Sequence, residues 1–315
     1  MWFIVAVVSF FLLAIAAVTD KFLLAKTTLV PVSFAFLVGL LGAAASSVLI
    51  IFEKNFYFPQ EHLFILITGG AGFYFALYFM YLAVVKQEVS RINPLINSLA
   101  PIFIYLLALL LAVEELSWLK LVCAAVTISG GYLLSQVGLV RTRLSKSVII
   151  YLILAALMFG LTNTFSKMAY QEIFFITAFV WLRWFTFLTA ILFVTVSGAW
   201  PVLLKLKKTS QPVVKSSPAP YGAGLDKPKN PWPALVVGQF SGGVAVILFQ
   251  YAISLGSVTI VSSLQGLQYI FLLLMTLFLS KKFPQILKEV ISPLVVKKKF
   301  FYCLLLTIGV VLVLI

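Results

Sequence analysis

Charged residues are scarce in this sequence. Only 10% of the 315 residues are Asp, Glu, Lys or Arg, whereas 63% are apolar. A soluble globular domain has about 25% charged and roughly 45–50% apolar residues. The composition therefore excludes an ordinary soluble protein, which would expose this apolar surplus to water, and a disordered chain, which needs few apolar residues. Lipid must solvate most of the surface.

Cysteine and histidine are almost absent. The two cysteines, Cys123 and Cys303, lie inside apolar runs and are typical of small buried hydrophobic residues. The single histidine, His62, lies at the edge of another apolar run. A disulfide-stapled secreted module, a metal site and histidine-based nucleophile chemistry lack their residues. We expect neither a metal nor a cofactor.

Acidic residues are the third scarcity. The chain has 9 Asp and Glu against 23 Lys and Arg, which gives a net charge of +14. The basic residues are spread over short segments beside apolar runs, where anionic lipid headgroups are better partners than nucleic acid. No carboxylate lies at the centre of an apolar run, so the clustered titratable groups of a membrane-embedded enzyme are missing. We expect a protein that is not an enzyme.

Long apolar runs are what the sequence has in abundance. A hydrocarbon core about 30 Å thick needs roughly 20 apolar residues per helix, and each spanning segment must satisfy its own backbone hydrogen bonds. The sequence predicts an all-α polytopic membrane protein with ten spans. These cover residues 2–19, 30–52, 62–85, 92–113, 117–138, 147–168, 174–199, 233–254, 257–280 and 299–315.

Two other stretches have different compositions. Residues 200–232 collect six lysines and several prolines, which is typical of a flexible basic loop. Residues 283–299 repeat apolar side chains at helical spacing, with lysines on the other face and at the end. This second pattern predicts an amphipathic helix lying on an anionic membrane surface.

The two halves of the chain carry a weak internal repeat. An offset of 146 aligns the first span, which ends at Lys21, with the sixth, which ends at Lys167; an offset of 168 aligns Asn97 with Gln265. Because each half has five spans, an odd number, the halves must insert in opposite orientations. This inverted repeat is typical of secondary transporters that bind substrate near the bilayer midplane. The repeats are predicted over residues 1–140 and 147–315.

Lysine and arginine set the predicted orientation. Segments after odd-numbered spans hold nineteen of these residues, and segments after even-numbered spans hold three. Basic residues accumulate on the cytoplasmic side. We therefore expect a multi-pass protein of the cytoplasmic membrane with both termini external.

Arg183 is the first candidate for function. It lies nine positions into the predicted span 174–199, about 13 Å deep. A charge there costs several kcal/mol unless it is paired or faces a wet cavity. Arg183 is predicted either to line the pathway and bind a carboxylate or phosphate, or to anchor helix-end carbonyls.

Polar residues in other spans form a second candidate set. Amides at helical spacing follow one face of each of two spans and could bind substrate or join helices. These are Asn93, Asn97, Gln265 and Gln268. Weaker candidates at comparable depth are Tyr78, Tyr81, Gln250 and Tyr251. Asp20, near the end of the first span, is the best candidate for ion coupling.

The sequence resembles the drug/metabolite transporter superfamily, in its ten-helix EamA-type branch. The resemblance rests on a small-residue helix, a proline motif followed by an acid, a closing glycine pair and three polar positions. These are Gly69-Gly70-Ala71-Gly72, Pro101-Ile102-Phe103 with Glu114, Gly130-Gly131, Asn163, Lys167 and Arg183. Where the family usually has Glu-Arg after the fourth helix, this chain has Glu114-Glu115.

The resemblance implies a permease for small polar or amphipathic solutes, commonly an exporter of amino acids or other metabolites. We expect a carrier that works by alternating access on a small-molecule substrate in the lipid bilayer. A flippase for lipid-linked sugars or nucleotide-sugar derivatives is the alternative within transport, and a structural membrane protein is the alternative outside it. A second copy of the chain is a further expected partner.

Overall fold

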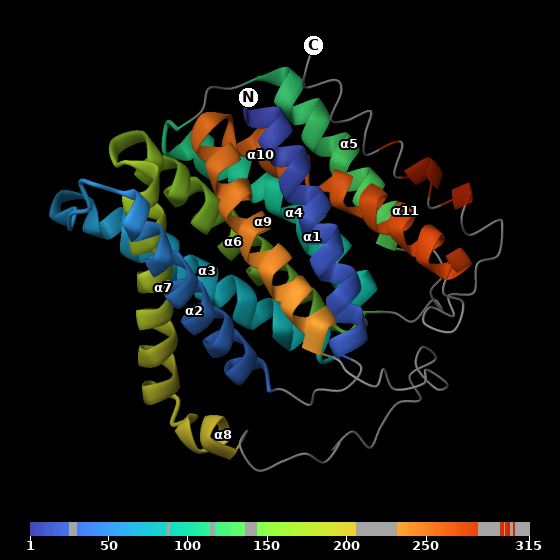
Figure 1. Cartoon of the computed structure of the whole chain (residues 1–315). Coiled ribbons are helices and arrows are strands. Elements are labelled where there is room, and N and C mark those ends of the chain that lie inside the picture. Colours follow the sequence, from blue (N-terminus) through green and yellow to red (C-terminus); the bar gives the residue numbers. More distant parts are fainter. Residues whose placement is uncertain are drawn as a thin grey trace.

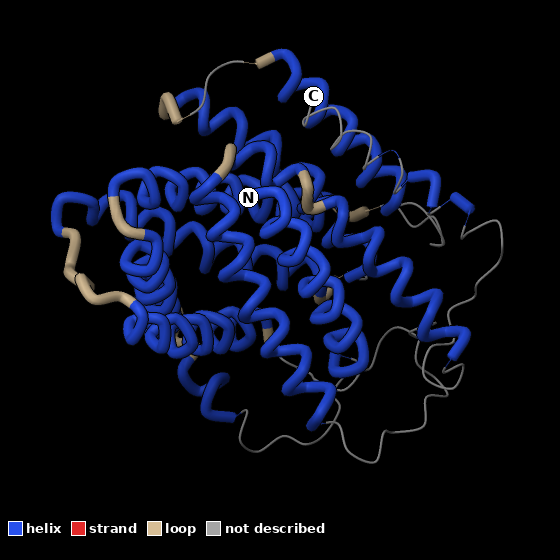
Figure 2. The backbone as a smooth tube through the Cα atoms, turned by 45° about the horizontal axis from the view of Figure 1, so that its top comes forward, coloured by secondary structure: helices blue, strands red, loops and turns tan. Residues whose placement is uncertain are grey.

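The structure is a computed structural model that describes residues 1–24, 30–86, 89–113, 117–135, 144–205 and 232–282, with 297–298, 300–302 and 305. Helices and short connections make up this described part, and no strand occurs within it (Figure 2). The elements are α1 (Trp2–Leu24), α2 (Pro31–Ser47), η1 (Val48–Phe52), η2 (Gln60–His62), α3 (Leu63–Val84), α4 (Val89–Leu110), α5 (Trp118–Ser135), α6 (Lys146–Glu172), α7 (Phe175–Val196), α8 (Trp200–Lys205), α9 (Trp232–Leu255), α10 (Val258–Ser263) and α11 (Gly266–Lys282).

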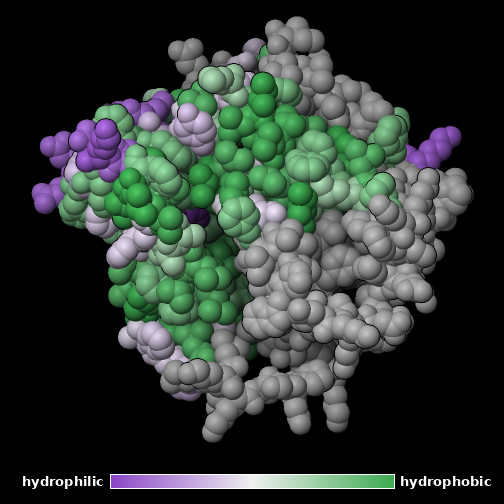
Figure 3. All heavy atoms as spheres, in the orientation of Figure 1, coloured by the Kyte–Doolittle hydropathy of each residue, from purple (hydrophilic) through white to green (hydrophobic). Residues whose placement is uncertain are grey.

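Five of these helical segments are long and apolar enough to cross a membrane. They are Pro31–Phe52, Gln60–Val84, Ile92–Leu110, Lys146–Glu172 and Phe175–Val196. Shorter apolar helices are Trp2–Ala17, Phe240–Leu255 and Val258–Leu272. Figure 3 shows the described surface as largely hydrophobic, with hydrophilic residues mainly at its left edge, near η1 and η2, and a smaller group at its right edge. This is the pattern of a polytopic membrane protein.

The helices follow the predicted apolar runs, with three differences. The predicted span 257–280 is divided into α10 and α11 by a turn at Leu264 and Gln265. Residues 200–205, which were expected to belong to a flexible loop, form α8, and the rest of that loop up to 231 lies outside the described residues. The predicted surface helix 283–299 and the span 299–315 also fall almost entirely outside them.

Two antiparallel helix pairs form the centre of the bundle. In the first, α1 lies along α9: the Ser9 hydroxyl donates to the Ala245 carbonyl at 2.9 Å, and the Phe10 and Phe249 rings are 5.7 Å apart (Figure 1). In the second, α3 lies along α6, where the Thr162 hydroxyl donates to the Gly69 carbonyl at 2.6 Å. The core is formed between these pairs and the helices beside them.

Glycines let α3 approach α6 and α7 closely. A Cβ on Gly70 would lie 2.7 Å from the Phe185 Cβ and 2.8 Å from the Leu182 carbonyl oxygen. A Cβ on Gly72 would lie 2.9 Å from the Leu161 side chain. Since real Cβ atoms do not come so near their neighbours, the small residues set the helix spacing.

The two ends of the bundle are distinguished by their helix connections. At the N-terminal end, the start of α1 lies against the α9–α10 turn: a Cβ on Gly256 would be 3.1 Å from the Trp2 ring. The α6–α7 turn is at the same end, since Lys167 contacts the Gly256 carbonyl. At the opposite end, Lys86 after α3 donates to Ser147 at the start of α6. Figure 1 shows α8 at this opposite end.

Candidate functional site

Arg183 lies inside the bundle, among α2, α3 and α7. It is eight residues, or about 12 Å, into α7 from Phe175, and only 7% of it is exposed. Its guanidinium carbon lies 4.1 Å from the centre of the Phe73 ring on α3 and 5.0 Å from that of Phe179. Gly42 on α2 makes room for the side chain, since its Cβ would lie 3.7 Å from the Arg183 Cδ.

The guanidinium has no hydrogen-bond acceptor in the described part of the chain. The Nε atom is buried and unpartnered, and the guanidinium rests on the aromatic faces of Phe73 and Phe179. A cation over an aromatic ring gains roughly 0.5–2 kcal/mol, which is less than the several kcal/mol that burying an unpaired charge costs. The expectation that Arg183 anchors helix-end carbonyls is not met by these residues. The site is electrostatically incomplete.

A polar chain joins α6 to α9. The Tyr170 hydroxyl donates to the Gln250 Oε1 at 3.1 Å, and the Gln250 Nε2 donates to the Asn163 Oδ1 at 3.2 Å. Gln250 and Asn163 are both buried. The Tyr170 ring lies 5.1 Å from Phe175, Phe175 stacks on Phe179, and Phe179 lies against the Arg183 guanidinium. Aromatic rings therefore connect these neutral donors and acceptors to the unpaired cation.

Lys167, on the same helix as Tyr170, has a different environment. Its ammonium donates to the carbonyls of Ile253, Ser254 and Gly256 at 3.0, 3.1 and 2.8 Å. These are free carbonyls at the C-terminal end of α9, where the helix dipole favours a cation. α6 continues to Glu172, beyond the predicted span 147–168, and so Lys167 lies in the last turns of the helix. Its role is to hold the ends of α6 and α9 together.

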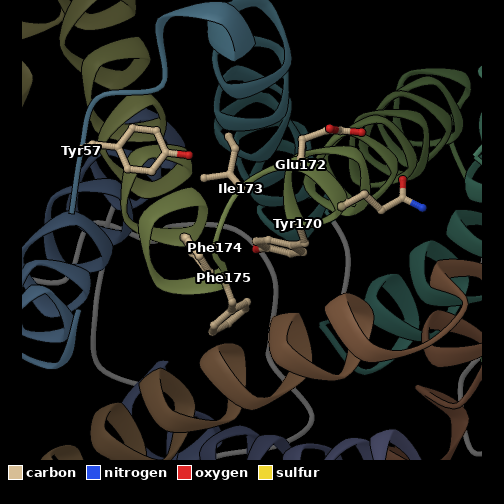
Figure 4. A pocket seen from close by; sticks show the side chains of 7 residues that line it. Tyr57, Tyr170, Glu172, Ile173, Phe174 and Phe175 are labelled. Atoms are coloured by element: carbon tan, nitrogen blue, oxygen red, sulfur yellow. The ribbon is translucent and has the colours of Figure 1, made fainter. Parts of the chain in front are cut away.

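A pocket of about 340 Å³ opens at the α6–α7 turn. Its lining comes from that turn and from the η1–η2 connection, and consists of Tyr57, Tyr170, Gln171, Glu172, Ile173, Phe174 and Phe175. Figure 4 shows the Tyr170 ring at the inner side of this space, and the Glu172 carboxylate pointing away from it. Tyr170 thus belongs both to the pocket wall and to the hydrogen-bonded series Tyr170–Gln250–Asn163.

The amides predicted on α4 and on the ninth span lie in another part of the bundle. The Asn97 Nδ2 donates to the Tyr269 hydroxyl at 2.8 Å, one turn beyond Gln265, which the repeat aligns with it. The Gln268 Nε2 donates to the Leu13 carbonyl at 3.5 Å. Gln265 lies in the turn between α10 and α11, so it does not share a regular helix face with Gln268 as expected. Most of these contacts join helices.

Asn93 differs from the other amides, because its buried Oδ1 has no partner. It belongs to α4 near the core cluster that contains Ile92 and Ile96, and so it is closer to the opposite end of the bundle. No described contact connects Asn93 to Arg183.

The predicted aromatic candidates make packing contacts. The Tyr81 ring lies 4.6 Å from Phe34, and the Tyr78 ring lies 4.9 Å from Phe193. Tyr251 is 39% exposed and its ring lies 5.1 Å from that of Phe175. Of this weaker set, Gln250 is the residue that the structure hydrogen-bonds to Tyr170 and Asn163. The side chain of the coupling candidate Asp20 lies outside the described residues, as do Glu114 and Glu115.

Two site residues were missed by the sequence reasoning. Phe73 and Tyr170 are aromatic residues in aromatic-rich spans, where nothing distinguishes a cation-binding ring from a packing ring. Tyr170 did carry a weak signal, because it lies seven positions after Asn163 and so on the same face of a helix. Asn163 was noted through the family resemblance and now belongs to the site.

Comparisons with known proteins bear on the fold alone. No family model matches the chain, and no curated protein matches it. Among solved structures, 26 chains match. One of them, described as "Crystal structure of protein", superposes with a TM-score of 0.62 over 98% of this chain and 95% of that chain, at 16% identity. The whole described architecture therefore resembles a fold that has been observed experimentally.

Proposed function

We propose that this chain is a secondary carrier of the drug/metabolite transporter type, in the EamA-like branch. It moves a small metabolite with an anionic group across the cytoplasmic membrane by alternating access, and Arg183 binds that group. The observation that carries the proposal is the buried Arg183 guanidinium with no acceptor. A carboxylate or phosphate would supply bidentate hydrogen bonds and the missing opposite charge.

The helix pairing supports an inverted repeat as the basis of this mechanism. If residues 1–140 and 147–315 are equivalent, then α1 corresponds to α6 and α3 corresponds to α9. The α1–α9 pair then corresponds to α6–α3, and both pairs pack extensively. Two equivalent halves joined through such pairs can exchange inward-open and outward-open arrangements.

The broken ninth span gives further support. The backbone turns at Leu264 and Gln265, between α10 and α11. Discontinuous helices near the bilayer midplane recur in secondary transporters. In this turn short-range bonds satisfy the backbone, since the Gln265 N–H donates to the Ser262 carbonyl and the Leu267 N–H donates to the Leu264 carbonyl.

Ligand-dependent thermal unfolding tests the proposal. The full chain in lipid nanodiscs would be heated with a panel of small carboxylates and phosphate esters, each beside its neutral amide or alcohol counterpart. Because binding to the folded state raises Tm, we expect at least one anion to raise Tm while its neutral counterpart does not. Arg183→Gln should lose this shift, and Arg183→Lys should keep part of it.

Transport of the same ligand completes the test. In proteoliposomes, the anion that raises Tm should exchange with its radiolabelled form, and Arg183→Ala should abolish this exchange. Thr189→Ala serves as a matched control on α7, because its hydroxyl bonds only the Phe185 carbonyl of its own helix. An anion shift that persists in Arg183→Gln would refute the role of Arg183, and binding without exchange would refute a carrier.

A further inference from the structure

The pocket at the α6–α7 turn is connected to Arg183 through a row of aromatic rings that begins at Tyr170. The pocket lining includes Tyr170 but not Arg183. The Tyr170 hydroxyl is bonded to the buried Gln250, and its ring lies 5.1 Å from Phe175, which stacks on Phe179 at 5.7 Å; the Phe179 ring lies 5.0 Å from the Arg183 guanidinium carbon. These rings therefore separate a solute in the pocket from the guanidinium.

We infer that this pocket is an access site for a small anion, and that Tyr170 is the barrier between it and Arg183. The inference rests on the proposed function, which it deepens by naming the entry path and the residue that closes it.

The lining of the pocket favours weak, temporary binding of the anion rather than final binding. It has no cationic side chain, and the acid in its lining, Glu172, is exposed with its carboxylate directed away from Tyr170 (Figure 4). Its volume of about 340 Å³ is at the small end for ligand pockets. The strong attraction for an anion lies behind the Tyr170 ring, at Arg183.

A hydrogen bond holds the barrier in place. The Tyr170 hydroxyl donates to Gln250 on α9, and Gln250 is itself fixed by Asn163 on α6. The Tyr170 ring also rests against Phe175, with 5.1 Å between ring centres. Movement of α9 relative to α6 would break the Tyr170–Gln250 bond and release the ring. The barrier is thereby linked to the helix movements that alternating access requires.

The pocket's position also identifies the source of the anion. It is formed by the α6–α7 turn and Tyr57, which precedes η2, so it opens at the end of the bundle rather than at its lipid-facing middle. A solute from the aqueous phase can enter there, whereas the headgroup of a lipid with two acyl chains would have to leave the bilayer.

Cysteine accessibility tests the barrier without knowledge of the substrate. In a Cys123→Ala, Cys303→Ala background, Gly42→Cys places a thiol beside Arg183. A Cβ there would meet only the Arg183 Cδ, at an ordinary 3.7 Å. Gln171→Cys places a thiol on the pocket lining, outside the barrier. Both are treated with the impermeant reagent 2-sulfonatoethyl methanethiosulfonate, in whichever preparation, intact cells or inverted vesicles, lets Gln171→Cys react.

We expect the thiol at position 42 to react at least tenfold faster when Tyr170→Ala is added, while the thiol at position 171 keeps its rate. Tyr170→Phe should give an intermediate rate. Gln250→Leu, which keeps the ring and removes its hydrogen-bond acceptor, should match Tyr170→Phe. An unchanged rate at position 42 in both Tyr170→Ala and Gln250→Leu would overturn the barrier. Thermal unfolding of each variant in nanodiscs shows whether it is folded, and the rate at position 171 controls for reagent access to the pocket.

A second reagent separates this inference from the proposed function. The cationic 2-(trimethylammonio)ethyl methanethiosulfonate reacts by the same chemistry with opposite charge. In the Tyr170→Ala background, we expect the anionic reagent to be favoured at least fivefold at position 42 relative to position 171, and Arg183→Gln to remove this preference. A faster reaction at position 42 without preference for the anionic reagent would refute anion binding at Arg183 and support the Tyr170 barrier. A preference for the anionic reagent without a faster reaction would support anion binding and refute the barrier.

Discussion

Two basic side chains of the second half, Lys167 and Arg183, have opposite environments although both lie inside long apolar helices. Lys167 donates to three carbonyls at the end of α9. Arg183 is buried more deeply, has an unpartnered Nε, and rests on the rings of Phe73 and Phe179. A cation whose hydrogen bonds are satisfied within the protein contributes to the fold. A cation without acceptors destabilises the empty site and favours a ligand that provides them.

Replacement of Arg183 should have the largest effect on transport. We expect Arg183→Gln to lower the exchange rate of the identified anion by at least a hundredfold. Its unfolding temperature without ligand should stay the same or rise, because an unpaired buried charge is removed. Exchange in proteoliposomes and thermal unfolding in nanodiscs measure the two quantities. A large fall in Tm would mean that Arg183 is a structural residue.

Replacement of Lys167 should show the reverse pattern. Lys167→Met removes three charge-assisted hydrogen bonds and leaves carbonyls unpaired, so we expect it to lower the free energy of unfolding by about 2–4 kcal/mol. The affinity for the anion, measured by titration at a temperature where the variant is folded, should change less than threefold. Lys167→Arg should recover most of the stability. A variant that is stable but no longer binds the anion would place Lys167 in the binding site.

The position of Phe73 under Arg183 depends on the close contact of α3 with α7. Gly70→Ala should destabilise the protein by about 1–3 kcal/mol, since the added Cβ would meet the backbone of α7 at Leu182 and Thr186. Gly243→Ala is the matched control, because a Cβ there has no neighbour within 4 Å among the described residues. It should be neutral or slightly stabilising. Urea or thermal unfolding of both variants checks the difference, and equal stabilities would contradict the packing.

The smallest effect is expected at Phe73 itself. Phe73→Leu keeps an apolar contact but removes the aromatic face below the guanidinium, which is worth roughly 0.5–2 kcal/mol. We expect the affinity for the anion to change two- to fivefold, through a less well-positioned Arg183. Phe79→Leu on the same helix, whose ring packs on Phe75 and Tyr78, should change it less. Equal changes in affinity for Phe73→Leu and Phe79→Leu would show that the Phe73 ring does not position Arg183.

Particular residues show how far the sequence reasoning reached. Arg183 could be singled out because a charge inside an apolar run is conspicuous, and Gln250 was recognised by its depth in the eighth span. Tyr170 and Phe73 could not be found in this way, because what distinguishes them is their contact with Gln250 and with Arg183 on other helices. The interruption of the ninth span was also not predicted. Its position at Leu264 and Gln265 lacks a proline, whereas α4 stays helical through Pro94 and Pro101.

The sequence by itself determined the helical class and the positions of most helices, because the length and apolarity of a run decide whether it can satisfy its backbone in lipid. It also determined which segments carry unusual polar residues. Only the tertiary structure decided which of these residues meet. Lys167 and Arg183 are both cations in apolar helices, and only the packing of α9 and α3 against them gives Lys167 three carbonyl acceptors and leaves the Arg183 Nε unpartnered over aromatic rings.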